Sequence, residues 1–162
     1  MKKLNDYFKN LDYSKFLLIS AIIIYLSDFL NIFYINLHFL PTKIDMNYIY
    51  KMLYLQGNNP NNFDPTYLME LRLVIINTMK NVFYLFLVYH AFVYFMYRRG
   101  KTWGRKYVYG YAFTGAILTI IELPFLIQRH IGWAIAMLIT TAIYIYVWYG
   151  IRHYKKAGII KD

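Results

Sequence analysis

Three ionisable side chains, Asp28, Lys80 and Glu122, stand inside long apolar runs of this 162-residue chain. A charge at the centre of a membrane-spanning helix costs about 3 kcal/mol on insertion scales, so such groups usually face other helices or a wet cavity. Two carboxylates and one ammonium at a common depth can bind a basic amine, move a proton or form an ion pair. These three positions are therefore the first candidates for a functional site.

The rise of an α-helix indicates how deep each charge lies. Counted from the expected cytosolic face, Asp28 lies at about 18 Å, Lys80 at about 16 Å and Glu122 at about 22 Å. Polar residues within one helical turn add hydrogen-bonding groups, and Tyr84 is a candidate aromatic wall. The predicted ligand-binding residues are Asp28, Asn31, Asn77, Lys80, Asn81, Tyr84 and Glu122.

Depth alone leaves the rotation of each helix open, so three interpretations stand. The charges line a ligand cavity, or Lys80 forms a packing ion pair with Asp28 or Glu122, or the charged groups reach water at the membrane surface. Pro124, two residues after Glu122, predicts either a kink that widens the space between helices or only the approach of the helix end.

Four apolar segments must position these residues. They cover about 16–39, 71–97, 107–127 and 131–151, and a spanning helix needs about 20 predominantly apolar residues. With 59% hydrophobic and 16% charged residues the chain is too apolar for a soluble domain. The sequence therefore predicts an all-α membrane protein, a four-transmembrane-helix bundle forming a single domain over residues 1–162.

The long connection at 40–70 carries a helix signal of its own. Asp45 is placed to cap a short helix in MNYIYKMLYLQ, which GNNPNNFDP then breaks. We expect this helix to lie at the membrane interface on the outer, luminal side; the alternative is an ordinary loop packed on the bundle. Residues 1–15, at the other end, are expected to form a short mixed-charge tail.

The net charge of +10 is concentrated beside the apolar segments. Basic residues in excess mark the cytosolic ends of membrane helices, which places both termini in the cytosol. The same distribution argues against a nucleic-acid partner, because no basic domain stands outside the membrane. Thirteen of the eighteen basic residues form three clusters, namely Lys2, Lys3, Lys9 and Lys15; Arg98, Arg99, Lys101, Arg105 and Lys106; and Arg152, Lys155, Lys156 and Lys161.

Several kinds of chemistry find no support in the sequence. Cysteine is absent, which excludes disulfides, thiolate metal ligands and cysteine nucleophiles. His90 stands far from the other histidines in the expected topology, so we predict that it hydrogen-bonds to a neighbouring helix and that no metal site exists. No nucleotide-binding loop or nucleophile motif occurs. We expect no cofactor and name no catalytic residue.

The order of segments resembles the EXPERA family, which contains the emopamil-binding and sigma-2 receptor-like membrane proteins. The resemblance is carried by YLSDFLNIFYINLHFLP at 25–41, YIYKMLYLQ at 48–56, FDP at 63–65, GKTW at 100–103 and YAFTGAILTIIELP at 111–124. It implies a luminal cavity for sterol-like or cationic amphiphilic ligands in the endoplasmic reticulum. Lys80 and Asn81 stand where the family usually has a glutamate, and Glu122 would then supply the carboxylate.

The expected function is therefore binding of a sterol, lipid or amphiphilic amine, with a role in sterol homeostasis or trafficking. The alternatives are a membrane enzyme that transfers a proton on a lipid or sterol, and a small ion-conducting or accessory subunit; the sequence favours a protein that is not an enzyme. Expected partners are membrane lipids and a sterol or hydrophobic-amine ligand, and a homodimer stays open. Without the resemblance, the multi-pass protein is assigned to the plasma membrane.

Overall fold

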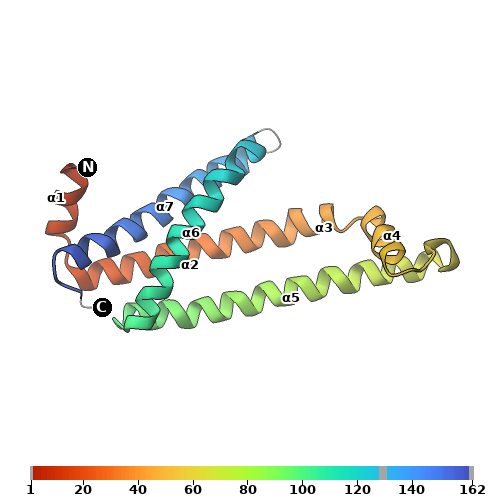
Figure 1. Cartoon of the computed structure of the whole chain (residues 1–162), viewed down its shortest axis with the longest axis horizontal. Coiled ribbons are helices and arrows are strands. Elements are labelled where there is room, and N and C mark those ends of the chain that lie inside the picture. Colours follow the sequence, from red (N-terminus) through yellow and green to blue (C-terminus); the bar gives the residue numbers. More distant parts are fainter. Residues whose placement is uncertain (1, 128–130, 161–162) are drawn as a thin grey trace. The chain divides into compact units, whose positions relative to one another are not determined.

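The computed structural model describes residues 2–127 and 131–160, and all regular elements within these ranges are helices (Figure 1). In chain order they are α1 (Lys2–Asn10), α2 (Tyr13–Tyr34), a π-helical turn (Ile35–Phe39), α3 (Leu40–Lys43), α4 (Met46–Leu55), a 3-10 turn (Pro60–Asn62), α5 (Pro65–Arg98), α6 (Thr102–Ile127) and α7 (Ile131–Lys156).

Four of these helical stretches are long and apolar enough to cross a membrane. They cover Tyr13–Lys43, Pro65–Arg98, Thr102–Ile127 and Ile131–Lys156, which confirms the prediction of an all-α chain with four such helices. The side of the membrane on which the termini lie stays a prediction. So does the single domain. The sequence also predicts a tight turn between the segments at 107–127 and 131–151, and this turn falls partly on residues 128–130, outside the described residues.

Most of these helices are longer than the apolar runs. The reason is that residues outside the runs, such as capping residues and glycines, set where each helix begins and ends. α5 begins six residues earlier than predicted, at Pro65, where the Asp64 carboxylate accepts a hydrogen bond from the Thr66 backbone N–H at 2.6 Å. A proline at the first helical position lacks only an N–H that the helix would leave unpaired. α5 then continues to Arg98, and Gly100 adopts a φ of 72°, a conformation that favours glycine.

The chain divides into two compact units. Unit 1 consists of Met1–Ser27 and His90–Asp162, and unit 2 consists of Asp28–Tyr89. α2 and α5 each contribute residues to both units.

Unit 1 is built around α6 and α7, which lie side by side as an antiparallel hairpin (Figure 1). Close packing at Gly115 brings the two helices together: a Cβ atom there would lie 2.7 Å from the ring of Tyr144. Three contacts between side-chain hydroxyls further join helices of this unit, linking Ser20 to Tyr97 at 2.8 Å, Ser27 to Thr140 at 3.1 Å and Thr141 to Thr119 at 2.8 Å. Small polar side chains of this kind commonly connect helices in membranes.

The N-terminal segment of unit 1 is an ordered helix, where the sequence predicted a tail. Phe8 on α1 is fully buried, and the hydroxyl of Tyr154 on α7 donates to the backbone carbonyl of Leu11 at 2.7 Å. The Tyr149 hydroxyl also donates to the side-chain oxygen of Asn5 at 2.7 Å. The aromatic residues of the last turns of α7 therefore supply the surface on which α1 folds.

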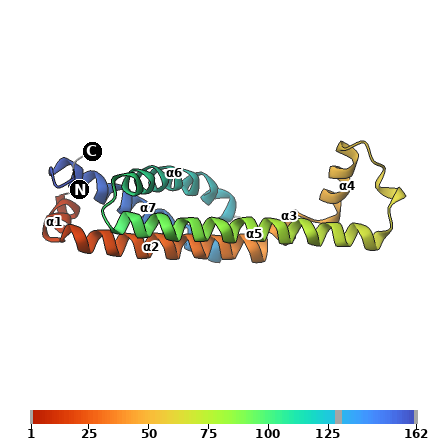
Figure 2. The same ribbon diagram turned by 90° about the horizontal axis from the view of Figure 1, so that it is seen from below.

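Unit 2 contains the end of α2, the π-helical turn, α3, α4 and most of α5. The Asp45 carboxylate caps α4 by accepting from the Tyr48 backbone N–H at 2.8 Å, as predicted. Ile49 and Leu53 of α4 are buried in a cluster with Leu68 of α5. α4 stands at a steep angle to α5 in Figure 2. Its luminal and interfacial location stays a prediction.

Candidate functional site

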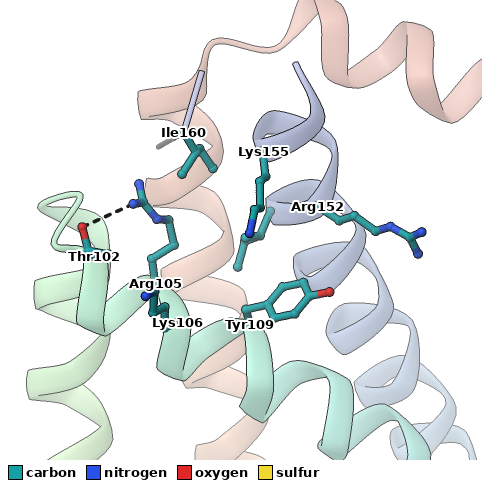
Figure 3. A pocket seen from close by; sticks show the side chains of 8 residues that line it. Thr102, Arg105, Lys106, Tyr109, Arg152, Lys155 and Ile160 are labelled. Atoms are coloured by element: carbon teal, nitrogen blue, oxygen red, sulfur yellow. Dashed lines mark hydrogen bonds between the residues drawn. The ribbon is translucent and has the colours of Figure 1, made fainter. Parts of the chain in front are cut away.

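A pocket lies between the first turns of α6 and the last turns of α7, wholly within unit 1 (Figure 3). Its volume is about 200 Å³. We call it the basic pocket, because four of its lining side chains are basic and none is acidic. The lining consists of Thr102, Arg105, Lys106, Tyr109, Ile151, Arg152, Lys155 and Ile160.

The local sequence explains how these side chains meet. Arg105, Lys106 and Tyr109 fall within about one turn of α6, and Ile151, Arg152 and Lys155 follow the same spacing on α7, so each set shares one helical face. The start of α6 and the end of α7 meet because the hairpin is antiparallel. Beyond α7, Gly158 has a φ of 73°, and the chain turns so that the buried Ile160 closes the pocket.

Arg105 is held at one edge of the pocket. Its guanidinium donates to the Thr102 hydroxyl at 3.4 Å, the contact drawn in Figure 3, and to the Tyr13 hydroxyl at 3.5 Å. Lys155 extends towards α6, whereas Arg152 points away from the pocket. The Arg152 guanidinium instead lies over the Trp148 ring, 5.5 Å from its centroid.

Aromatic rings continue from the basic pocket along α6 and α7 towards the middle of both helices. The ring of Trp148 lies 6.3 Å from that of Tyr109 and 5.7 Å from that of Phe113. Aromatic rings of Trp and Tyr are favoured at the boundary between headgroups and hydrocarbon. The surface therefore changes from cationic to aromatic within about one helical turn.

The basic pocket is suited to bind an anion. Cationic groups crowded into one pocket repel one another, and a bound phosphate or carboxylate replaces that repulsion with attraction. Arginine adds a planar pair of donors that matches phosphate oxygens, while lysine acts as a point charge. In the sequence analysis these basic residues served only to predict which side of the membrane each helix end faces. The pattern that could have indicated the pocket is that one basic cluster lies at the start of α6 and another at the end of α7, and these two ends meet in an antiparallel pair.

The residues predicted to bind ligand are placed differently from one another in unit 2. Asp28 on α2 is 1% exposed, and Asn31, one turn later, is half-buried. Asn77, Asn81 and Tyr84 are exposed on α5, and Lys80 is half-buried. The spacing of these four residues on α5 places them along one side of the helix. Among the described residues of unit 2, Lys80 forms no ion pair, so an ion pair between Lys80 and Asp28 is not part of its packing.

Glu122 belongs to α6 of unit 1 and is exposed. Among the described residues of this unit it forms no hydrogen bond or ion pair. α6 continues through Pro124 to Ile127, so the proline lies close to the end of the described helix. The role of Glu122 as a ligand-binding carboxylate stays a prediction.

His90 is fully buried among tyrosines. Its Nε2 atom lies 2.9 Å from the hydroxyl of Tyr107 on α6, and its Nδ1 atom lies 3.1 Å from the hydroxyl of Tyr94. The Tyr111 ring meets the imidazole edge to face, with centroids 4.7 Å apart. The predicted hydrogen bond between His90 and a neighbouring helix is therefore confirmed. Across residues 2–127 and 131–160, no three His, Asp or Glu side chains gather as a metal site requires.

Asn36 is a buried polar residue near the end of the first apolar segment, and it is not among the residues predicted to bind ligand. It lies in the π-helical turn Ile35–Phe39 and is 5% exposed. Neither its amide nitrogen nor its amide oxygen has a hydrogen-bond partner among the described residues. A π-helical turn inside an α-helix often accompanies a functional position.

No family model, characterised protein or solved structure matches this chain. The resemblance to the EXPERA family stays a prediction.

Proposed function

We propose that this chain is a multi-pass membrane protein that binds an anionic, phosphate-bearing lipid through the basic pocket. The observation that carries the proposal is the convergence of Arg105 and Lys106 from α6 with Lys155 from α7 around a single pocket. Both helices are long and apolar enough to cross a membrane. A headgroup at their ends would leave its acyl chains against their apolar surfaces.

The size of the pocket favours a headgroup over a whole sterol. Pockets that enclose drug-sized ligands measure roughly 300–1,000 Å³. A pocket of about 200 Å³ accommodates only part of such a molecule. The phosphate and its immediate substituents would occupy the pocket, and the acyl chains would lie outside it. Exposed apolar side chains on α6, including Phe113 and Ile117, offer that outer surface.

The positive charge of the pocket also favours a membrane leaflet that is rich in anionic lipid. Basic residues near an anionic membrane surface contribute about 1 kcal/mol each. If the basic clusters face the cytosol as the sequence predicts, the pocket opens to the leaflet that carries most anionic lipid in many membranes. The aromatic rings of Tyr109 and Trp148 would then stand at the boundary between headgroups and acyl chains.

The test compares thermal stability of the purified protein in detergent with added phosphatidylglycerol, phosphatidylcholine or inorganic phosphate. A ligand at a hundred times its Kd stabilises the folded state by about 2.7 kcal/mol. We expect phosphatidylglycerol to raise the melting temperature and phosphatidylcholine to leave it unchanged. Full stabilisation by inorganic phosphate alone would assign the pocket to a soluble anion.

A pair of matched double variants separates the pocket from general surface charge. Lys106→Gln with Lys155→Gln removes two cations from the lining, whereas Arg98→Gln with Lys101→Gln removes two exposed cations outside it. The pocket variant should lose most of the phosphatidylglycerol effect, and the control variant should keep it. An equal loss in both would show that the lipid responds to net charge only, and the proposal would fail.

Binding of a sterol or hydrophobic amine is a second candidate, supported by Asp28, a carboxylate with 1% exposure inside the first apolar helix. A buried carboxylate in such a helix is a functional-site hypothesis in its own right. Sterols and hydrophobic amines should stabilise the wild type, and an amine should do so less in Asp28→Asn. The EXPERA family, the endoplasmic reticulum, lipid turnover and ion conduction stay predictions.

A further inference from the structure

One side of α5 carries a continuous exposed row of residues within unit 2. The row recurs at alternating intervals of four and three residues, an average of 3.5, and every member is exposed. We call it the α5 seam, and it consists of Glu70, Val74, Asn77, Asn81, Tyr84 and Val88.

The spacing of the α5 seam is that of a helix packed along a parallel partner. A repeat of 3.5 residues keeps one row facing a second helix when the two coil around each other with a left-handed twist. A face that met only lipid would have no reason to carry polar members, because acyl chains offer neither donors nor acceptors.

Two amides occupy the middle of the α5 seam. α5 spans 34 residues, about 51 Å at 1.5 Å per residue, so its central part crosses the hydrocarbon core. Asn81 lies at the midpoint of the helix, and Asn77 lies about one turn away. Both are exposed in the single chain, and among the described residues neither forms a side-chain hydrogen bond. At that depth, a partner helix is needed to satisfy their donors and acceptors.

We infer that the α5 seam is the interface of a parallel homodimer, with a second copy of this chain as its occupant. An asparagine amide both donates and accepts, so Asn77 and Asn81 can each pair with the same residue of the partner copy across a two-fold axis. Copies inserted with the same topology present α5 in parallel, as this pairing requires. This inference does not depend on the basic pocket.

One position of the seam resembles the core position that fixes register in parallel coiled coils. Val74, Asn81 and Val88 occupy equivalent positions seven residues apart. In parallel coiled coils, a single asparagine among β-branched residues at such a position sets register and number of strands. Tyr84 lies one turn after Asn81 on the same row and adds an aromatic contact surface.

Because the chain contains no cysteine, disulfide cross-linking of single-cysteine variants tests the seam directly. Val74→Cys and Val88→Cys probe the seam, and Val82→Cys is a matched control on another side of α5. The three valines are comparably exposed, at 60%, 68% and 55%. Oxidation in native membranes should link copies through the two seam cysteines and far less through the control.

A second comparison tests the amides themselves. Adding Asn77→Leu and Asn81→Leu to Val88→Cys should lower the linked fraction, with dimerisation weakened roughly tenfold, equivalent to about 1.4 kcal/mol. The leucine variant should still fold, since leucine suits a helix in a bilayer. Equal linking at all three cysteines, no linking at any, or linking unaffected by the leucines would overturn the inference. Linking at the control alone would place the contact on another face and also overturn it.

Discussion

The hydroxyl of Tyr107 on α6 lies 2.9 Å from Nε2 of His90 on α5, and the imidazole is completely buried. A neutral imidazole has one donor nitrogen and one acceptor nitrogen. Since Tyr94 meets the other nitrogen, each ring nitrogen of His90 has a tyrosine hydroxyl within hydrogen-bonding distance, and the tautomer of the ring decides which groups donate. This arrangement satisfies a polar ring in the core of unit 1 with groups from two helices.

Tyr107→Phe should therefore destabilise the protein, because it removes a hydrogen bond to a nitrogen of a buried imidazole. The expected loss of unfolding free energy is about 1–3 kcal/mol. Tyr50→Phe removes the same hydroxyl from an exposed position on α4 and should change stability by less than about 0.5 kcal/mol. Denaturant unfolding of the two variants in detergent measures the difference. Equal stabilities would mean that the His90 contact contributes nothing.

Gly115→Ala should loosen the α6–α7 hairpin. The added methyl group would lie 2.7 Å from the Tyr144 ring, which is 3% exposed and has little room to move. Overpacking of this kind costs about 1–3 kcal/mol. Gly110→Ala on the same helix meets no atom within 4 Å and should stabilise by up to about 1 kcal/mol through helix propensity. The melting temperature should therefore fall in Gly115→Ala and rise in Gly110→Ala. A shift in the same direction for both variants would contradict the packing described for Gly115.

Asn36→Leu should raise the stability of the isolated protein. A buried amide without partners costs about 1–3 kcal/mol, and leucine of similar size removes that cost. Asn31→Leu, at a half-buried position earlier in α2, should have a smaller effect. Chemical unfolding of both variants provides the measurement. A clear loss of stability in Asn36→Leu would show instead that a polar group bound at Asn36 supports the fold.

The cap at the start of α5 should depend on pH. Hydrogen bonds from Thr66 lower the pKa of Asp64 below its usual value of 3.8. A carboxylate whose pKa is lower in the folded state stabilises that state at pH values above the unfolded pKa, and the effect is lost as pH falls through the folded pKa. Hydrogen exchange at the first turn of α5 should therefore accelerate under acid relative to Asp64→Asn, which keeps a capping oxygen without titrating. Identical pH profiles would exclude this role for Asp64.

The sequence by itself determined the four long helices. A run of about 20 apolar residues usually forms a helix in a bilayer, because a helix satisfies its own backbone hydrogen bonds. It also determined the cap of α4, since Asp45 needs only the backbone N–H three residues away. Such features depend on neighbours in sequence and were confirmed without any knowledge of how helices pack.

Only the tertiary structure decided which side chains of those helices meet. Asp28 and Glu122 looked alike in sequence, as carboxylates at similar depth, yet Asp28 is buried and Glu122 is exposed. The basic pocket and the tyrosines around His90 likewise join residues from different helices. The physical reason is that lipid-facing and core-facing positions are both apolar in a membrane helix, so the sequence pattern does not report its rotation. Packing of helix against helix decides that rotation, and with it the place of every polar group.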